Sequence, residues 1–78
     1  MAMTVEEYAS ELCTTPEDAF LTMVKDSEYY VDGETEIVDK PEYDMDTQLW
    51  RVMIKDGDGE TYLACVDDQL DPGNVFIF

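Results

Sequence analysis

The first part of the chain carries apolar residues at helical spacing. These residues are Val5, Tyr8, Ala9 and Leu12. Positions i, i+3, i+4 and i+7 share one face of an α-helix. Thr4 precedes them and Glu7 follows it by three positions, the pattern of a capping box in which each side chain accepts a hydrogen bond from the other residue's backbone N–H. The pattern therefore predicts a short helix over residues 4–13.

A second helix start follows directly. Thr15 can cap the helix, Pro16 suits its first position, and the next two residues are acidic, which favours the positive end of the helix dipole. An apolar stripe then consists of Ala19, Phe20, Met23 and Val24. We expect a helix over residues 16–27.

Beyond Ser27 the pattern changes from helical to extended. Residues 29–31 are strand formers, Asp32-Gly33 is a turn dipeptide, and residues 35–38 are suited to return as a second strand. Proline at position 41 interrupts this run, so residues 39–46 are expected to form an acidic loop.

The clearest strand covers residues 49–55, in which Trp50, Val52 and Ile54 point one way and alternate with Arg51, Met53 and Lys55. A turn over residues 56–59 leads to a hairpin partner at 61–66. A further turn at residues 71–74 precedes a last apolar strand at 75–78.

Helices that precede strands indicate the α+β class rather than alternating α/β. We predict a single compact acidic domain over residues 1–78, with two short N-terminal helices followed by an antiparallel sheet of three to five strands. Trp50, Val52 and Ile54 are expected to pack on the stripe of the second helix.

Charge narrows the possible functions. The 78 residues include 20 Asp and Glu, 4 Lys and Arg and no His, which gives a formal net charge of -16. Direct binding to nucleic acid or to an anionic membrane needs cations, so neither is expected. An apolar fraction of 45% still favours a folded chain over a disordered one. Like-charged copies repel, so we expect a monomer.

None of the usual catalytic constellations is present, so we expect neither an enzyme nor a cofactor. Asp56, Asp58 and Gly59 resemble part of a calcium loop, but no register places acidic residues at all the required positions. We expect a plain hairpin turn and no metal site there. Cys13 and Cys65 are expected to be reduced and mostly buried, and the chain to be cytoplasmic.

The carboxylates are spread through the predicted elements instead of forming a tail. We expect partner-binding residues at Asp32, Glu34, Glu36, Asp39, Glu42, Tyr43, Asp44, Asp46, Asp56, Asp58 and Glu60. Many of them recur at every second position, and alternate side chains of an extended segment lie about 6.6–6.8 Å apart on one face. Such a row is comparable in scale to a phosphate ladder, so the acids are candidates to imitate DNA.

Tyrosines lie among these acids, and tyrosine beside carboxylate is suited to bind arginine. Tyr43 is the best interface candidate, while Tyr30 and Tyr62 fit core or hairpin packing equally well. A solvated acidic face that serves solubility alone is the alternative for the whole set. The charge is about double the roughly 2–8 units suited to a small domain, which favours a function for it.

Size, acidity and helix-then-sheet order, with acids concentrated at residues 26–46 and 56–60, resemble the small acidic phage-encoded anti-CRISPR proteins that inhibit type I Cascade complexes. The resemblance is one of overall character and transfers no individual residue. It implies an inhibitor that binds a basic surface of a Cas effector subunit in the host bacterial cytoplasm and blocks target DNA. The alternatives are an immunity protein that neutralises a basic nuclease toxin, and an accessory protein whose acidity serves solubility.

Overall fold

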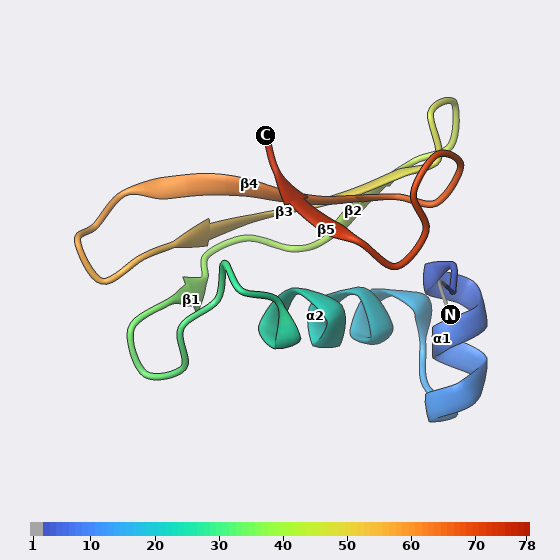
Figure 1. The fold of residues 1–78 in the computed structure, drawn as a ribbon, viewed down its shortest axis with the longest axis horizontal. Coiled ribbons are helices and arrows are strands. Elements are labelled where there is room, and N and C mark those ends of the chain that lie inside the picture. The colour runs from blue at the N-terminus through green and yellow to red at the C-terminus, as the bar shows by residue number, and fades with distance from the viewer. Residues whose placement is uncertain (1–2) are drawn as a thin grey trace.

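The structure is a computed structural model that describes residues 3–78; the first two residues of the predicted domain lie outside the described part. Two helices precede a five-stranded antiparallel sheet, which confirms the predicted α+β class (Figure 1). Both helices lie on the same side of the sheet, with α2 running along it and α1 near one end.

Helix α1 (Val5–Leu12) begins with the predicted capping box. The Thr4 hydroxyl accepts from the Glu7 N–H at 3.2 Å, and the Glu7 carboxylate accepts from the Thr4 N–H at 2.9 Å. The helix ends where Cys13 takes a left-handed conformation, with φ at 54°. Its buried face consists of Val5 and Ala9, so the helix is held by its cap and by a narrow apolar stripe.

Helix α2 (Pro16–Asp26) has the predicted start. The Thr15 hydroxyl accepts from the Asp18 N–H at 3.3 Å, and proline occupies the first turn. At the other end, the Ser27 hydroxyl donates to the Val24 carbonyl at 2.6 Å, which satisfies one of the last carbonyl groups. The helix buries Ala19, Phe20 and Val24 against the sheet.

Strand β3 (Leu49–Lys55) is the centre of the sheet. It pairs along its whole length with β4 (Thr61–Asp67), from Leu49 opposite Asp67 to Lys55 opposite Thr61. Strand β5 (Val75–Ile77) pairs with the far side of β4. The pairing of β3 with β4 confirms the predicted hairpin with its turn at 56–59.

Two short strands share the other side of β3. Strand β1 (Glu36–Ile37) pairs with the end of β3, and β2 (Glu42–Asp44) pairs with its beginning. Pro41 lies between them and has no N–H to donate, which explains why this edge is two strands instead of one. The expectation that residues 39–46 form only a loop is therefore wrong.

The predicted hairpin of residues 29–38 is also wrong, because residues 29–31 form no strand. The segment 31–35 closes on itself: the N–H groups of Glu34 and Thr35 donate to the Val31 carbonyl, and the Thr35 hydroxyl accepts from the Val31 N–H. Gly33 allows this turn because its φ is 88°. The following strand pairs with β3 instead.

The core lies between the helices and the inner face of the sheet, as predicted. Phe20 packs on Trp50 with ring centroids 5.5 Å apart, and Val52 and Ile54 are buried beside them. Of the two free cysteines, Cys65 is buried as expected. Cys13 is exposed, because the left-handed end of α1 turns it away from the core.

Candidate partner-binding surface

Two acidic turns from distant parts of the chain meet at one end of the sheet. Glu34, on the 31–35 turn, lies over Gly57 on the β3–β4 turn, where its Cβ is 3.4 Å from the position that a Cβ at Gly57 would take. We call the carboxylates of these two turns the turn-end cluster. Its members are Asp32, Glu34, Asp56, Asp58 and Glu60.

Asp56 fixes the second of these turns. Its Oδ1 accepts from the N–H groups of Asp58 and Glu60, each at 2.9 Å. The backbone hydrogen bond from Glu60 is the main cause that lowers the pKa of Asp56, so this carboxylate is charged at neutral pH. Because a side chain organises the backbone, the turn holds its acidic residues in a defined arrangement.

A cavity of about 590 Å³ opens beside the turn-end cluster. The residues that line it include Tyr29, Tyr62 and Ile54 and the acidic residues Glu34, Asp56 and Asp58. Among the described residues, no Lys or Arg lines it. The Tyr62 hydroxyl donates to Glu60 at 2.6 Å, and this bond is the main cause that raises the pKa of Tyr62.

Such a cavity suits a guanidinium or ammonium side chain. Carboxylates supply charge-assisted hydrogen bonds, and tyrosine rings supply a surface on which a planar cation stacks. Sequence reasoning favours Tyr43 as the aromatic contact, but the structure puts Tyr29 and Tyr62 beside the carboxylates. The signal in the sequence was the alternation that places Tyr62 on the same face as the core residues of β4.

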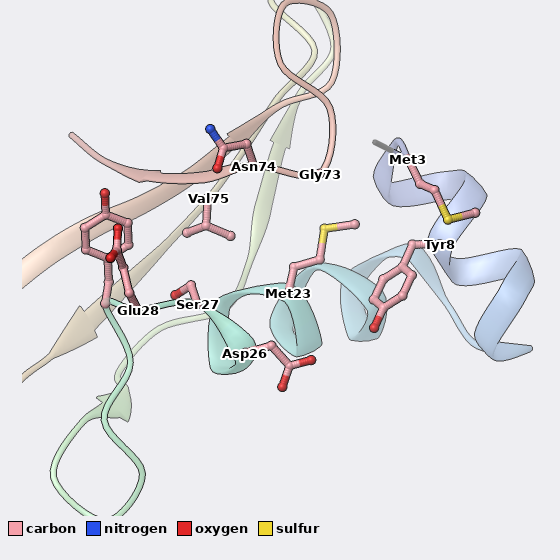
Figure 2. A pocket seen from close by; sticks show the side chains of 10 residues that line it. Met3, Tyr8, Met23, Asp26, Ser27, Glu28, Gly73, Asn74 and Val75 are labelled. Carbon is pink, nitrogen blue, oxygen red and sulfur yellow. The ribbon is translucent and has the colours of Figure 1, made fainter. Parts of the chain in front are cut away.

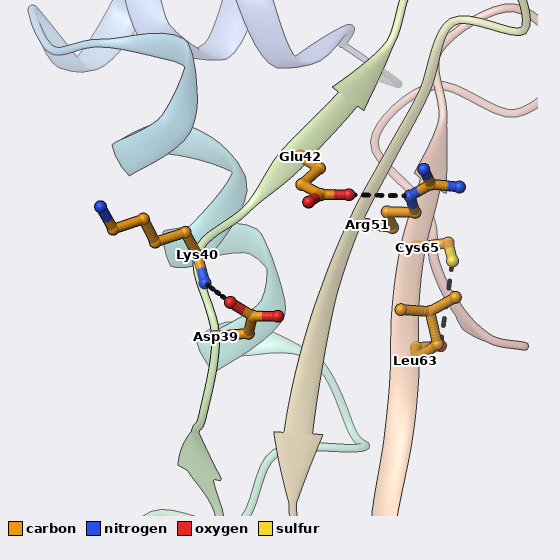
Figure 3. A network of polar contacts seen from close by, with 6 residues as sticks. All are labelled: Asp39, Lys40, Glu42, Arg51, Leu63 and Cys65. Carbon is orange, nitrogen blue, oxygen red and sulfur yellow. Dashed lines mark hydrogen bonds and ion pairs between the residues drawn. The ribbon is translucent and has the colours of Figure 1, made fainter.

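The other predicted acids lie along the β1–β2 edge. Glu36 is on β1 opposite Lys55, and Glu42 on β2 forms an ion pair with Arg51 at 3.5 Å (Figure 3). Asp39 accepts a hydrogen bond from the Lys40 N–H at 2.7 Å. Glu36 and Glu42 therefore lie opposite cations of β3. Glu36 is paired with the residue before Asp56, so it lies next to the turn-end cluster, whereas Glu42 lies near the other end of the strand.

The turn after β2 uses its acids for structure. Asp44 Oδ1 accepts from the Asp46 N–H at 2.9 Å, and this bond shapes the turn that leads into β3. Tyr43 points to the inner face of the sheet, where its ring centroid is 4.8 Å from that of Trp50. The ring remains 41% exposed, and its partial burial raises the pKa of Tyr43.

A regular phosphate-like ladder is not formed. Asp32 and Glu34 lie on a closed turn, Asp58 lies on another turn, and Asp46 follows the end of β2. Only an extended segment gives the regular repeat of alternate side chains. The acids are therefore gathered by the approach of two turns, and the predicted spacing argument is wrong.

A further acidic group at residues 67–71 serves the fold. Both oxygens of Asp68 accept from the Val5 N–H, at 3.1 and 3.2 Å, and so cap α1 from a distant part of the chain. Burial raises the pKa of Asp68, although the hydrogen bond from Val5 opposes this shift. The Trp50 Nε1 also lowers the pKa of Asp68 and so favours the charged carboxylate. Among the described residues, this nitrogen is buried and has no well-formed hydrogen bond.

A second cavity, of about 480 Å³, lies between the helices and the turn before β5. Figure 2 shows Met23 and Tyr8 pointing into this region, while Asp26 points away from Val75. Its lining is richer in methionine and contains fewer carboxylates than the cavity beside the turn-end cluster. It is the weaker candidate for a cationic partner.

Neither a comparison with protein-family models nor searches for similar curated proteins and solved structures gives a significant match. Among residues 3–78, no helix is long and apolar enough to span a membrane. Over the same residues, no group of three or more Cys, Asp or Glu side chains is arranged to hold a metal ion.

Proposed function

We propose that the protein is an inhibitor that occupies the basic DNA-binding surface of another protein, in the manner of an anti-CRISPR acting on a type I Cascade complex. The observation that supports this proposal is the turn-end cluster beside a cavity lined by carboxylates and tyrosines. The partner surface is one that normally binds phosphate, and the protein excludes DNA by occupying it.

The balance of charges supports a basic partner. In the part of the chain that the structure describes, the ion pair between Arg51 and Glu42 is the only salt bridge, so most carboxylates are left without a cation. A net charge of -16 attracts a basic surface over a distance of about one Debye length, near 8 Å at physiological salt. Long-range attraction therefore speeds the encounter, and the local arrangement decides where the partner binds.

The cavity provides the specific contact. An arginine of the partner would place its guanidinium among Glu34, Asp56 and Asp58 and its plane against a tyrosine ring. A hydrogen bond to a charged group contributes about 1.5–3 kcal/mol. The same arginine would otherwise bind a DNA phosphate, so the two ligands compete.

The decisive experiment compares two double charge reversals. Glu34→Lys with Asp58→Lys alters the turn-end cluster. Asp58 donates to Asp56 through its backbone N–H, so the substitution keeps that hydrogen bond. Glu11→Lys with Glu17→Lys is the matched control, because it changes the net charge equally at exposed positions on the helices. Binding to a purified type I Cascade complex is measured with and without competing duplex DNA.

We expect the turn-end variant to lose at least about 100-fold in affinity and the control to lose less than about tenfold. Wild-type binding should weaken steeply as salt rises and should be displaced by DNA. Equal losses in the two variants would show that net charge alone matters. Absence of Cascade binding, with inhibition of a basic nuclease instead, would identify a toxin as the cytoplasmic partner.

A further inference from the structure

Strand β5 forms one edge of the sheet, and among the described residues no strand pairs with its free side. The Phe78 N–H donates to the Leu63 carbonyl, so the backbone of Phe78 faces β4. Hydrogen-bonded and non-hydrogen-bonded pairs alternate in an antiparallel ladder, so the N–H and C=O groups of Val75 and Ile77 point away from β4. Within residues 3–78, no other group forms a hydrogen bond with them. These backbone groups are thus available to an additional strand.

The opposite edge of the sheet is protected against such pairing, whereas β5 is not. Pro41 interrupts that edge between β1 and β2, and its charged residues include Glu36, Lys40 and Glu42. Charge and proline on an edge discourage pairing with another chain. Strand β5 and the residue after it read Val-Phe-Ile-Phe, with neither a charge nor a proline. The edge of β5 is therefore the one that suits strand addition.

The two cavities lie one after the other along β5. Val75 lines the cavity of about 480 Å³, and Ile77 lines the cavity of about 590 Å³ beside the turn-end cluster. Both residues are paired with buried residues of β4, so they point to the inner face of the sheet. Figure 2 shows the Val75 side chain pointing from β5 toward the end of α2. Tyr29 lines both cavities, which makes them neighbours.

A strand added antiparallel to β5 would present alternate side chains to the two cavities. Antiparallel pairing is the more stable kind, and every strand pair of this sheet is antiparallel. Directly opposed residues of such a pair share one face, so the residues opposite Val75 and Ile77 also point inward. They are two positions apart in the added strand, or about 6.8 Å.

The two cavities select different side chains. The cavity beside Val75 is lined by Met3, Tyr8 and Met23, which suit an apolar side chain. The cavity beside Ile77 combines the carboxylates and tyrosines described above, which suit arginine. Among the described residues, no Lys or Arg lines either cavity. A second copy of this chain is a poor occupant, because each copy carries a charge of -16.

We infer that β5 binds an extended segment of the partner that adds one strand to the sheet and carries an arginine and an apolar residue at alternate positions. The arginine lies opposite Ile77, and the apolar residue follows two positions later, opposite Val75. Backbone hydrogen bonds supply affinity, and the two cavities supply specificity. The inference rests on the proposed function for the cavity that receives the arginine, and it adds the form in which the partner presents that arginine.

Two short peptides with blocked ends test the alternation. Thr-Thr-Arg-Thr-Leu-Thr-Thr places arginine and leucine on one face, whereas Thr-Thr-Arg-Leu-Thr-Thr-Thr has the same composition and charge but places them on opposite faces. Their affinities for the purified full chain are measured by NMR titration. We expect the first peptide to bind at least about tenfold more tightly. Hydrogen exchange at the Val75 and Ile77 N–H groups should slow when it binds.

N-methylation of the first peptide separates strand addition from attraction of charge. In the antiparallel pair, the arginine N–H donates to the Ile77 carbonyl, whereas the N–H of the threonine between arginine and leucine points away from β5. A methyl group on the arginine nitrogen should therefore weaken binding at least about tenfold, and one on that threonine nitrogen less than about threefold.

Ile77→Pro removes an N–H that points away from β4, so the pairing of β5 with β4 is kept. Ile77→Thr is the matched control, because it also shortens the side chain but keeps the N–H. We expect the proline variant to bind the peptide at least about fivefold more weakly than the threonine variant.

Equal affinity of the two peptides, or equal effects of the two methyl groups, would overturn the inference. The peptide measurements need no Cascade complex. Peptide binding as expected without Cascade binding would therefore overturn the proposed function alone. Cascade binding without the expected peptide preference would overturn the strand-addition inference alone.

Discussion

Alternate residues of β3 lie in opposite surroundings, although they share one strand and one set of neighbours. On the inner side, Val52 and Ile54 are buried among the helices, whereas Met53 on the outer side is only partly covered. Burial of apolar area is the main stabilising term in folding, so the inner face holds the molecule together. The outer face contributes less buried area and therefore less to folding stability.

The largest expected effect is a difference in the free energy of unfolding between substitutions on the two faces of β3. Ile54 is 1% exposed, so Ile54→Ala should lower the free energy of unfolding by about 2–5 kcal/mol because it leaves a cavity in the core. Met53→Ala on the outer face should cost about 1 kcal/mol or less. Urea denaturation measures both values, and equal losses would contradict the assignment of the two faces.

A smaller effect is expected where the inner face meets solvent. Tyr43 and Tyr29 are 41% and 40% exposed, but only Tyr43 packs on Trp50. Tyr43→Ala should therefore lower the free energy of unfolding by about 1–2 kcal/mol, because it removes ring packing and buried area. Tyr29→Ala is the matched control and should cost less than half as much. A greater loss at Tyr29 would mean that the wall of the cavity, and not the ring pair, supports the fold.

The smallest effect is a difference in pH dependence. The folded pKa of Asp56 is lowered, so its contribution to stability is present above the unfolded pKa and is lost as pH falls through the folded value. The folded pKa of Asp68 is raised, so its contribution is present below the unfolded pKa and is lost as pH rises through the folded value. As pH rises, the contribution of Asp56 to stability therefore increases, whereas the contribution of Asp68 decreases.

Melting temperatures measured between about pH 3 and pH 7 test this difference. Relative to wild type, Asp56→Asn should become less stable as pH rises. Asp68→Asn should become relatively more stable over the same range, because its amide oxygen still accepts from the Val5 N–H without the cost of burying charge. Slopes of the same sign in the two variants would contradict the assigned pKa directions.

Local signals in the sequence were sufficient for much of the fold. The cap at Thr4, the proline start of α2 and the alternation of β3 each depend on neighbouring residues, and all three are confirmed. The error at residues 29–31 has a different origin, because the pairing of β1 with β3 and the hydroxyl of Thr35 decide that segment. Strand formers next to a turn dipeptide do not reveal a distant partner.

For the candidate site, too, local signals were read from the sequence but contacts between distant segments were not. The acids were identified by composition alone, but their grouping depends on contact between Glu34 and Gly57, which are far apart in the sequence. Tyr62 lines the cavity because it is paired with Ile54 across β3 and β4, so the two side chains lie on the same face of the sheet. The regular spacing inferred from alternate positions failed, since turns and not extended strands carry most of these carboxylates.

Trp50 is the only tryptophan of the chain, and it lies between Phe20 and Tyr43 with its indole nitrogen buried. Its fluorescence emission therefore reports on one defined place, where helix, central strand and edge strand meet. Opening of that junction would shift the emission to longer wavelength, and excitation transfer from Tyr43 would fall when the edge strand separates. Local unfolding at this junction can thus be followed by intrinsic tryptophan fluorescence, without a label.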